Sequence, residues 1–379
     1  VIGGRGEKTA NLILNRASQT KRQPGSSFKP LSVYAPAIEE GVINYGSNYE
    51  DTPFEGNWPQ NESGGFTGPM DIATAVAKSK NTVAVKVLND LSPETSYKYL
   101  TEKLGFTTIV NEEVINGKIM TDIALSPLAL GGLTKGVTVR EMTGGYAALA
   151  NGGQYIEPHC YTKIVDNNGK TVMENDSSGT QAFSEETAFI TTKLLENAVK
   201  VGTGTPAKMS SGMAVAGKTG TTENSHDRWF AGYTPYYTGV VWFGYDNQKS
   251  INGATVNPSA KAWRLVMEKI HENKDVKTFD ESEPDTVVTA KYCAYTGDAP
   301  GIFCATKVGY YKKGETPSKK CSGYHYGGGS SSSSSSNNDD DEDEDEDTGT
   351  GGGTTEPGGG GTDPGGGTTE PGGGGTDPG

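Results

Sequence analysis

A serine and a lysine three positions apart near the start of the chain, Ser26 and Lys29, constrain the fold and the chemistry most. Residues i and i+3 share one face of a helix, so the amine of Lys29 can reach the Ser26 hydroxyl. Pro24 and Gly25 precede the pair and an apolar, periodic run follows, which predicts a helix over 30–41 with Ser26 at its N-terminus. Free N–H groups there favour developing negative charge, and a neighbouring amine can activate a serine as a nucleophile. The alternative is a capped helix with a solvated lysine.

Two further motifs make the catalytic interpretation more specific than S-x-x-K alone. The second motif reads S-x-N, at Ser79-Lys80-Asn81, and the third reads K-T-G-T-T, at Lys218-Thr219-Gly220-Thr221-Thr222. Helical periodicity over 71–91 is broken around 79–81, so we expect the second motif at a junction between two helices. The third motif lies at the end of the segment 213–222, which reads as a strand.

The order of the expected elements predicts an α/β fold. Segments 213–222, 228–234 and 238–245 follow one another with short turns, which favours an antiparallel sheet. Helices are expected over 93–105, 121–152 (with glycine breaks), 184–201 and 257–272, the last with Trp263, Val266 and Met267 facing inward, whereas 154–175 reads as a hairpin and 42–69 as a long loop. A serine on a helix that faces a lysine on an edge strand would line a cleft.

Composition divides the chain into three predicted parts: a main domain over 1–275, a small cysteine-containing module over 283–326, and a tail over 327–379. The tail consists of Gly, Ser, Thr, Pro, Asp and Glu and contains a 14-residue repeat at 351–364 and 365–378 with no apolar face to stack. We therefore expect the tail to be disordered, either as a solvated spacer or as a wall-spanning or partner-binding segment.

The net charge of −14 comes almost entirely from thirteen acidic residues of the tail. The remainder is close to neutral and shows none of the basic excess expected of a nucleic-acid-binding domain, so we expect no nucleic-acid partner. No stretch reaches the length of a membrane span. The chain begins with Val1 rather than methionine, and we expect it to be a fragment of a longer protein.

Four cysteines are present: Cys160, Cys293, Cys304 and Cys321. None forms a C-x-x-C pair, so the spacing of a zinc ribbon is absent and no metal site is predicted. The last three are crowded before the tail, where a disulfide would suit an oxidising compartment, and free thiols are an equally good interpretation. The four histidines are scattered, which argues against both a metal site and a Ser-His-Asp triad.

With all three motifs considered together, residues 1–275 resemble the transpeptidase domain of a class A, bifunctional penicillin-binding protein. The resemblance also includes Asn15-Arg16-Ala17, the run 21–30, Gly136-Val137-Thr138 with Tyr146-Ala147, Asn151-Gly152-Gly153, the run 216–222 and the run 227–233. It implies the β-lactamase/transpeptidase fold, an antiparallel sheet flanked by helices, here with the first strands lying upstream of Val1. Lys80 stands where an aspartate is common, and the remaining pattern holds.

The resemblance implies a serine D,D-transpeptidase that cross-links peptidoglycan stem peptides through an acyl-enzyme and is acylated by β-lactams, without a cofactor. Ser26 would be the nucleophile, Lys29 a neutral amine serving as base with its pKa lowered by burial and by Lys218, and Ser79 a proton relay. Asn81 would hydrogen-bond the substrate backbone, and Gly220 would let the substrate lie against the strand. The terminal carboxylate would be held by Lys218, Thr219, Thr221 and Thr222, and the oxyanion by the backbone N–H groups of Ser26 and Thr221.

The implied location is the extracytoplasmic face of the bacterial membrane, with membrane contact only through an N-terminal anchor that is missing here, as is the expected glycosyltransferase domain. The expected partners are donor and acceptor stem peptides, β-lactam antibiotics and the cell-wall synthesis machinery. Several residues receive a structural interpretation instead: Lys80 as a solvated helix lysine, Trp229 and Trp242 as core residues, and Asp227 and Arg228 as strand-end structure.

Three other functions remain open at this point. A β-lactamase needs a carboxylate to activate water, for which Glu112 and Glu113 are candidates, although a surface acidic turn fits them better. A D,D-carboxypeptidase would share every catalytic residue and use water as the acceptor. The non-enzymatic alternative is a β-lactam sensor or a cell-wall-binding scaffold that retains the fold.

Overall fold

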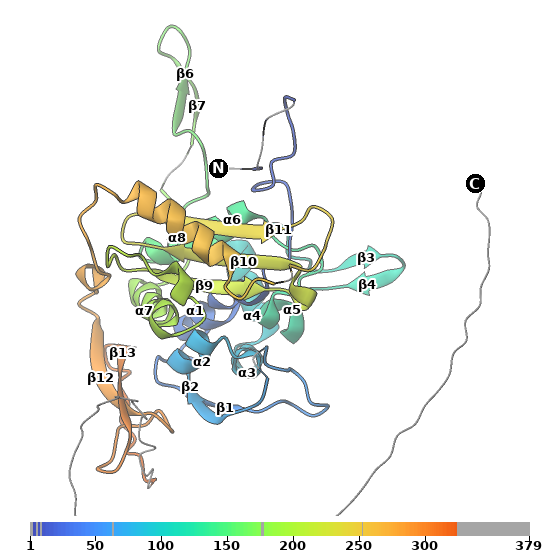
Figure 1. The fold of residues 1–379 in the computed structure, drawn as a ribbon. Coiled ribbons are helices and arrows are strands. Elements are labelled where there is room, and N and C mark those ends of the chain that lie inside the picture. The colour runs from blue at the N-terminus through green and yellow to red at the C-terminus, as the bar shows by residue number, and fades with distance from the viewer. Residues whose placement is uncertain are drawn as a thin grey trace, which may run out of the picture. The chain divides into compact units, whose positions relative to one another are not determined.

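The structure is a computed structural model that describes residues 3–4, 7, 10–62, 64–175, 178–251 and 253–323. Its sheet beside the candidate site has three antiparallel strands, β9 (Ala216–Thr221), β10 (Asp227–Tyr233) and β11 (Thr238–Gly244), in the order β11-β10-β9 (Figure 1). The three strands were predicted within a few residues of these bounds. Among the described residues, the third motif therefore lies on an edge strand, as expected, with a strand partner on one side only.

Alternating side chains of β10 face two different cores, because successive residues of a strand point to opposite faces. Trp229, Ala231 and Tyr233 belong to the main buried cluster. Phe230 points the other way and packs edge-to-face on Trp263 of α8 (Pro258–Ile270), at a centroid distance of 5.1 Å. The sheet is thus covered on both faces.

The expected inward face of α8 is partly wrong. Trp263 and Met267 are 1% and 4% exposed, whereas Val266 is 55% exposed. Residues four apart share a helix face, and Val266 is displaced by about 80° from the centre of the face that Trp263 and Met267 define. Leu265 and Val266 point away from the sheet, so the apolar face of this helix is narrower than its composition indicated.

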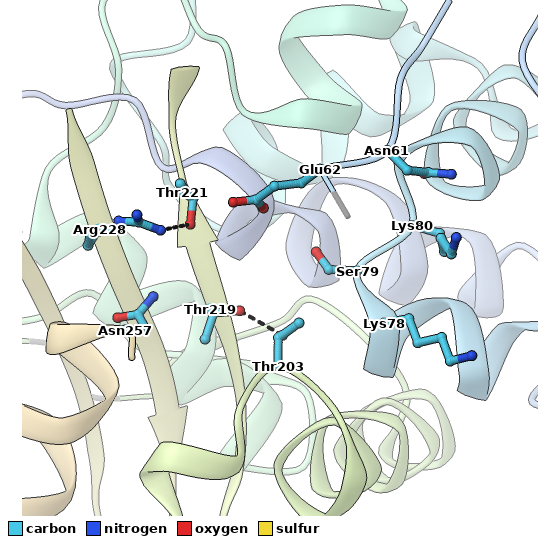
Figure 2. A pocket seen from close by; sticks show the side chains of 10 residues that line it. All are labelled: Asn61, Glu62, Lys78, Ser79, Lys80, Thr203, Thr219, Thr221, Arg228 and Asn257. Atoms are coloured by element: carbon cyan, nitrogen blue, oxygen red, sulfur yellow. Dashed lines mark hydrogen bonds between the residues drawn. The ribbon is translucent and has the colours of Figure 1, made fainter. Parts of the chain in front are cut away.

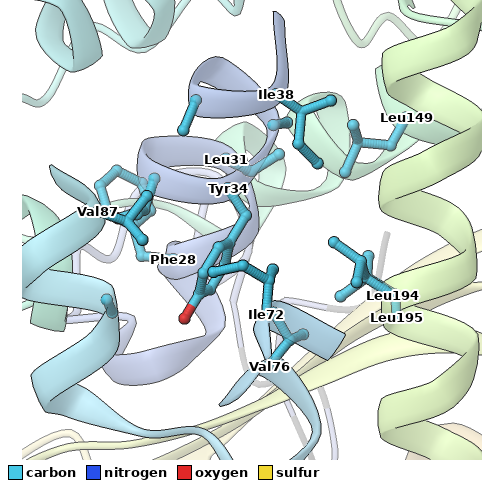
Figure 3. Packing of buried hydrophobic residues seen from close by; sticks show 14 of the residues in the cluster. Phe28, Leu31, Tyr34, Ile38, Ile72, Val76, Val87, Leu149, Leu194 and Leu195 are labelled. Atoms are coloured by element: carbon cyan, nitrogen blue, oxygen red, sulfur yellow. The ribbon is translucent and has the colours of Figure 1, made fainter. Parts of the chain in front are cut away.

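The serine of the first motif lies on a helical segment in the centre of the main core. This segment begins as a 3₁₀ turn (Gly25–Phe28), continues as a π-helical turn (Pro30–Tyr34) and ends as α1 (Ala35–Glu39). Phe28, Leu31 and Tyr34 are at most 1% exposed. They pack among Val87, Ile72, Val76, Leu194 and Leu195 (Figure 3). Burying each such side chain contributes on the order of 1.5–3 kcal/mol, so the core fixes the position of the serine turn.

Two helices meet at the second motif, as predicted. Ser79 is the C-cap of α2 (Ile72–Lys78), and α3 (Asn81–Leu91) begins two residues after it. The other helices are also close to their predicted places. They are α4 (Pro93–Lys98), followed by a π-helical turn (Tyr99–Lys103), α5 (Leu125–Leu130), α6 (Val139–Ala150), which begins with a capping box between Thr138 and Glu141, and α7 (Glu185–Val201).

The region 42–69 is not a continuous loop, contrary to expectation. Its ends form an antiparallel pair, β1 (Asn48–Asp51) with β2 (Gly68–Asp71). These strands are short, and β2 contains Gly68 and Pro69, so they lack the period-two apolar pattern that identifies a strand from sequence. Further two-stranded pairs are β3 (Glu113–Ile115) with β4 (Lys118–Met120), β5 (Gln154–Tyr155) with β8 (Thr180–Gln181), and β6 (Lys163–Val165) with β7 (Thr171–Glu174), the hairpin expected within 154–175.

A C-terminal hairpin, β12 (Val287–Cys293) with β13 (Thr306–Lys312), follows the main domain. Tyr292 and Tyr311 of this hairpin belong to the main buried cluster, and Lys307 Nζ lies 2.6 Å from an Asp71 carboxylate oxygen. The hairpin therefore packs on the main domain, and the division at 275–283 stays a prediction. The predicted tail over 327–379 lies outside the described residues. Within the described part, no helix has the length and apolar character needed to cross a bilayer.

Candidate active site

Ser26 and Lys29 lie in the first turns of the serine segment. The 3₁₀ turn covers Gly25–Phe28 and Lys29 directly follows it with helical backbone angles, so the two residues are one helical turn apart. Ser26 is half-buried, and its hydroxyl has no hydrogen-bond partner among the described residues. Lys29 is fully buried. The segment thus carries a half-buried hydroxyl at Ser26 and a buried amine at Lys29.

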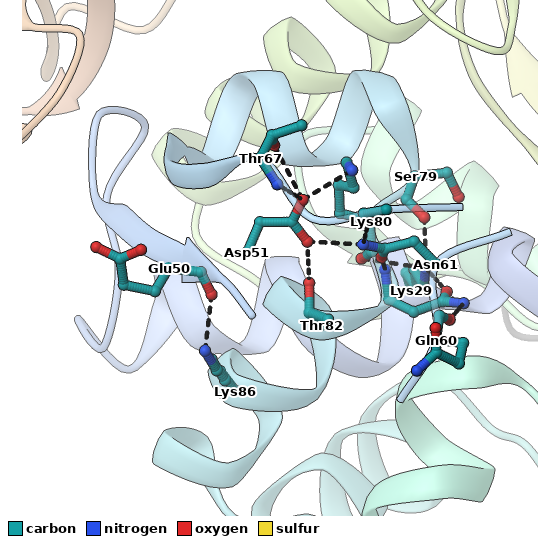
Figure 4. Close-up of polar contacts among 12 residues, drawn as sticks. Lys29, Glu50, Asp51, Gln60, Asn61, Thr67, Ser79, Lys80, Thr82 and Lys86 are labelled. Carbon is teal, nitrogen blue, oxygen red and sulfur yellow. Dashed lines mark hydrogen bonds and ion pairs between the residues drawn. The ribbon is translucent and has the colours of Figure 1, made fainter. Parts of the chain in front are cut away.

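The amine of Lys29 is held by the second motif (Figure 4). Lys29 Nζ donates to Asn81 Oδ1 at 2.7 Å and to the Ser79 carbonyl oxygen at 3.0 Å, with a longer contact of 3.4 Å to the Lys80 carbonyl oxygen. A neutral amine has two hydrogens, which matches the two short contacts and leaves the lone pair available to accept a proton. None of these partners is a carboxylate, so no anion in this set of contacts stabilises the charged form.

Ser79 occupies a left-handed backbone conformation, with φ 58° and ψ 37°, at the C-terminus of α2. A residue other than glycine is uncommon there and costs of order 1 kcal/mol or more, and such strain is concentrated at functional sites. Because α2 ends in this way, the Ser79 hydroxyl turns toward β9, where Lys218 Nζ donates to Ser79 Oγ at 2.8 Å. Ser79 therefore contacts both lysines, one through its carbonyl and one through its hydroxyl.

The two buried lysines have lowered pKa values. Burial lowers the pKa of Lys29 well below its usual value, and the charge of Lys218 lowers it further, while the charge of Glu62 opposes the shift. Burial also lowers the pKa of Lys218, to about 7, again against Glu62. The expected influence of Lys218 on Lys29 is confirmed, with burial as the larger cause. A larger fraction of Lys29 is therefore neutral, and able to accept a proton, than of an exposed lysine at the same pH.

The serine turn is packed directly against the edge strand. A Cβ on Gly220 would lie 2.2 Å from the Pro24 carbonyl oxygen, and a Cβ on Gly25 would lie 2.4 Å from the Thr221 carbonyl oxygen. Gly25 also has φ +54°, which disfavours other residues. The role expected for Gly220 was clearance for the substrate, but the space beside it is filled by the serine turn. Glycines here bring Ser26 against the third motif.

A cavity of about 250 Å³ opens beside Ser79 between the edge strand and the loop before β2 (Figure 2). On the strand side, Arg228 donates to Thr221 Oγ1 at 3.0 Å, and the hydroxyls of Thr203 and Thr219 are 2.7 Å apart. The lining residues are Asn61, Glu62, Lys78, Ser79, Lys80, Thr203, Thr219, Thr221, Arg228 and Asn257. Two hydroxyls and a guanidinium on one wall form a suitable cradle for a carboxylate.

Two candidate residues have contacts that differ from the expected ones. Thr222 does not line the cavity. Its hydroxyl donates to an Asp227 carboxylate oxygen and accepts from the Asp227 backbone N–H. Asn81 has both ends of its amide engaged, with Oδ1 accepting from Lys29 and Nδ2 donating to the Gln60 carbonyl oxygen at 2.7 Å. Asn81 thus positions the amine of Lys29 in this structure.

The interpretation of Lys80 as a solvated lysine is wrong. Lys80 is 3% exposed, and its Nζ lies 2.7 Å from Asp51 Oδ2 (Figure 4). Burial alone would raise the pKa of Asp51, but hydrogen bonds from Lys80, Thr82, Asn61 and Thr67 outweigh it and leave that pKa lowered. The backbone before α3 is extended at Lys80, with φ −63° and ψ 128°, so its side chain leaves the helix face and enters this cluster.

Several residues of the cavity were missed by sequence analysis. Arg228 could have been found from strand pairing, because it lies opposite Thr221 in the antiparallel register and residues paired in this way share a face. Asn61 and Glu62 come from an irregular loop with no periodic signal, and Thr203 follows the end of α7. No pattern in the sequence identified these three.

The two tryptophans of the sheet differ in burial. Trp229 is 1% exposed and donates to the Gln23 carbonyl oxygen at 2.8 Å, so it is a core residue, while Trp242 is half-buried and donates to Asp227. Glu113 lies on the β3–β4 hairpin, forms an ion pair with Lys135 and does not line the cavity. This agrees with its interpretation as part of a surface acidic turn. His271 is buried and contacts Thr234.

The geometry and the three motifs agree with a comparison of the sequence with family models. Residues 4–267 match the model of the penicillin binding protein transpeptidase domain. The chain belongs to this family. The match includes all three motifs, and the antiparallel sheet with flanking helices is the fold that the family resemblance implied.

Curated relatives of this family member include penicillin-binding protein 1A of Clostridium tetani, which is 33% identical over 86% of this chain and 43% of that protein. Penicillin-binding protein 4 of Bacillus subtilis is 36% identical over 69% of this chain and 41% of that protein. The chain spans less than half the length of these relatives. Among solved structures, penicillin-binding protein 1A of Haemophilus influenzae superposes with a TM-score of 0.66 at 24% identity, covering 81% of this chain and 50% of that chain, which supports the fold.

Proposed function

We propose that this chain is a serine D,D-transpeptidase that joins peptidoglycan stem peptides through an acyl-enzyme on Ser26. The observation that carries the proposal is the buried amine of Lys29, which lies one turn after Ser26 on the same helical segment and donates to Ser79 and Asn81, with no carboxylate among these partners. Such an amine is a base at neutral pH, and a serine next to it can act as a nucleophile. Membership in the transpeptidase-domain family supports the same activity.

Acylation would proceed by attack of Ser26 on the peptide carbonyl, followed by loss of the leaving amine. The Ser26 oxygen attacks the carbonyl of the penultimate D-alanine while its proton passes to Lys29 Nζ. The C–N bond then breaks, and the leaving nitrogen takes a proton from the Ser79 hydroxyl, to which Lys218 Nζ donates at 2.8 Å, while the proton held by Lys29 passes to Ser79 and restores it. In the second half, the amine of a second stem peptide attacks the ester and gives a proton to Lys29, and the Ser26 oxygen takes this proton as the C–O bond breaks. Each proton transfer of this type contributes about 10²–10⁴ in rate.

Recognition of the substrate would use the edge strand. The terminal carboxylate fits the wall formed by Thr219, Thr221 and Arg228, where the half-buried guanidinium supplies positive charge. Lys218 is fully buried and bonded to Ser79, so we assign it to proton control more than to carboxylate binding. The backbone N–H groups of Ser26 and Thr221 would bind the oxyanion, as the close packing of Gly25 on Thr221 favours.

For the longer protein of which this chain would be part, we propose the organisation implied by its relatives. It would act at the extracytoplasmic face of the bacterial membrane and carry a glycosyltransferase domain and an anchor outside the present chain. Its partners would be donor and acceptor stem peptides, β-lactams and the cell-wall synthesis machinery. The chain itself spans less than half of the curated relatives, which is consistent with this division.

Labelling with a fluorescent penicillin tests the nucleophile. The wild-type chain should become covalently labelled, and Ser26→Ala should not. Ser27→Ala is a matched control, because Ser27 is adjacent but buried and its hydroxyl donates to the Pro24 carbonyl oxygen at 2.7 Å. Labelling that persists in Ser26→Ala, or is lost equally in folded Ser27→Ala, would refute Ser26 as the acylated residue.

Product analysis separates the related activities. Given a D-Ala-D-Ala peptide and an amine acceptor, a transpeptidase should form the cross-linked product, whereas a carboxypeptidase should release D-alanine with water as the acceptor. Glu62 is the carboxylate that lines the cavity, and its charge would favour an approaching cationic amine. Rapid turnover of the penicilloyl adduct would indicate a β-lactamase, and acylation without any peptide product would indicate a sensor or scaffold.

A further inference from the structure

Three cysteine side chains meet in the C-terminal hairpin, far from the catalytic motifs in sequence. Cys293 ends β12, Cys304 lies in the connection to β13, and Cys321 follows β13. Their three Sγ atoms all lie within 4.8 Å of one another. Cys293 and Cys321 are buried and Cys304 is half-buried, so the cluster is closed on one side and open to solvent on the other.

The backbone around the cluster brings these separate segments together. Cys321 N–H donates to the Ala299 carbonyl oxygen, and Ala299 N–H donates to the Lys319 carbonyl oxygen, each at 2.8 Å. Gly297 N–H closes a turn onto the Cys293 carbonyl oxygen at 2.8 Å. Gly301 N–H donates to Cys304 Sγ at 3.2 Å, which fixes the sulfur atom relative to this loop.

The loops that carry the cysteines have little hydrophobic core of their own. Between the strands, Ile302 is 96% exposed and Phe303 is 62% exposed. The buried tyrosines of the hairpin, Tyr292 and Tyr311, face the main domain instead. Small irregular segments that bury so little apolar surface usually depend on a disulfide or a metal ion for a fixed structure.

The geometry favours a metal ion over a disulfide. A disulfide uses two cysteines and would leave the third thiol buried beside it, whereas a metal ion uses all three. Zinc binds thiolates at about 2.3 Å in tetrahedral geometry, which separates neighbouring sulfur atoms by roughly 3.8 Å and fits a cluster of this size. Zinc is the common divalent ion that prefers thiolate ligands in structural sites.

We propose that Cys293, Cys304 and Cys321 form a structural zinc site that fixes the loops of the C-terminal hairpin. Binding replaces the three thiol protons by one Zn²⁺ ion and involves no oxidation. The fourth ligand would enter from the solvent-exposed side at Cys304, as water or a further protein donor. Sequence analysis predicted no metal site because the three cysteines lack C-x-x-C spacing, and the fold supplies the proximity that the spacing does not.

Metal content provides the first test. The full chain, purified anaerobically without chelators or thiol reductants, should contain about one zinc ion per chain by inductively coupled plasma mass spectrometry. Cys293→Ser, Cys304→Ser and Cys321→Ser should each lower this to near zero. Cys160→Ser is the matched control, since Cys160 is exposed and outside the cluster, and it should retain the ion. A metal-free chain that fails to bind added zinc, or a disulfide between two of the three cysteines, would overturn the proposal.

A second test keeps the proposal falsifiable if the variants fold poorly. Removing zinc from the wild-type chain with a chelator should raise amide exchange in residues 294–305 and 315–323, and zinc should restore protection. Penicillin labelling of Ser26 should change little, because the motif contacts lie in the main domain. Equal exchange with and without the chelator would refute a structural zinc ion.

Discussion

Lys29 and Lys80 are both buried lysines beside the Ser79–Asn81 turn, but their neighbours are opposite in kind. Lys80 lies 2.7 Å from Asp51 Oδ2, in a cluster where Thr82 and Asn61 also donate to that carboxylate. Lys29 bonds only to carbonyl oxygens and an amide, and the nearby charge of Lys218 repels its protonated form. One cluster stabilises a buried ion pair, and the other favours a neutral amine.

This contrast shows how one turn can serve structure and chemistry at once. Burial disfavours a charged lysine in either place, and a carboxylate partner compensates for it in only one. The ion pair of Lys80 with Asp51 fixes the residue between Ser79 and Asn81, and so fixes the two residues that contact Lys29. The structural lysine thereby positions the reactive one.

The largest expected effect is on acylation when Lys29 is replaced. Lys29→Met should lower the rate of penicillin acylation by about 10²–10⁴, because the general base is lost while the apolar stem is kept. Stopped-flow or gel-based labelling measures this rate. Unchanged acylation by Lys29→Met would mean that another group accepts the Ser26 proton.

The ion pair should matter mainly for stability. Asp51→Asn should lower the free energy of unfolding by about 3–5 kcal/mol, because it leaves the Lys80 ammonium buried without its carboxylate. The control is Glu272→Gln, which breaks an exposed ion pair with Lys269 and should cost no more than about 1 kcal/mol. Urea unfolding measures both. Equal effects of the two variants would contradict the distinction between the clusters.

The same carboxylate gives a pH dependence with a definite sign. The pKa of Asp51 is lowered in the folded chain, so its stabilising effect is present above the unfolded value near 4 and is lost as the pH falls through and below that value. Asp51→Asn should therefore reduce the loss of stability between pH 5 and pH 3. An unchanged slope of unfolding free energy against pH in this range would contradict the expectation.

Removing Lys218 should shift the pH profile of acylation in a defined direction. The charge of Lys218 lowers the pKa of Lys29, so Lys218→Met should raise that pKa. Acylation needs neutral Lys29, so the midpoint of its decline toward low pH should lie at a higher pH in Lys218→Met than in the wild-type chain. The midpoint of the acid limb is measured independently of the maximal rate. A shift to lower pH would contradict the arrangement of the two amines.

Glu62 should give the smallest effect, with the opposite sign. Its charge raises the pKa values of Lys29 and Lys218, so Glu62→Gln should lower both and extend acylation to lower pH. Glu62 is exposed, so solvent screens its charge and the shift should be smaller than that of Lys218→Met. A shift of the acid midpoint larger than that of Lys218→Met, or a shift to higher pH, would show that Glu62 does not act through its charge on the two lysines.

The parts of the fold and site that depend on local pattern could be predicted from the sequence. The edge strand of Lys218, the junction at Ser79 and the helical turn of Ser26 all follow from periodicity and from proline and glycine positions. The lowered pKa of Lys29 followed from its expected burial near a second amine. These features depend on residues close together in sequence or on a recognised set of motifs.

The parts that depend on long-range contacts could not be predicted. The partner of Lys80 is 29 positions away in a short strand with no apolar pattern, so its burial was missed. Glu62 reaches the cavity from an irregular loop, and the three cysteines meet only because the hairpin and the following segment fold together. In each case, the contact is set by tertiary packing and leaves no periodic signal in the chain.

The protonation state of Lys29 tests the central claim most directly. Nuclear magnetic resonance of isotope-labelled lysine side chains, with the Lys29 signal assigned by its loss in Lys29→Met, reports the charge of that amine as the pH is varied. We predict that the signal titrates well below the ordinary lysine value of about 10.4. A Lys29 signal that stays charged at pH 8 and titrates near the ordinary value would contradict the account.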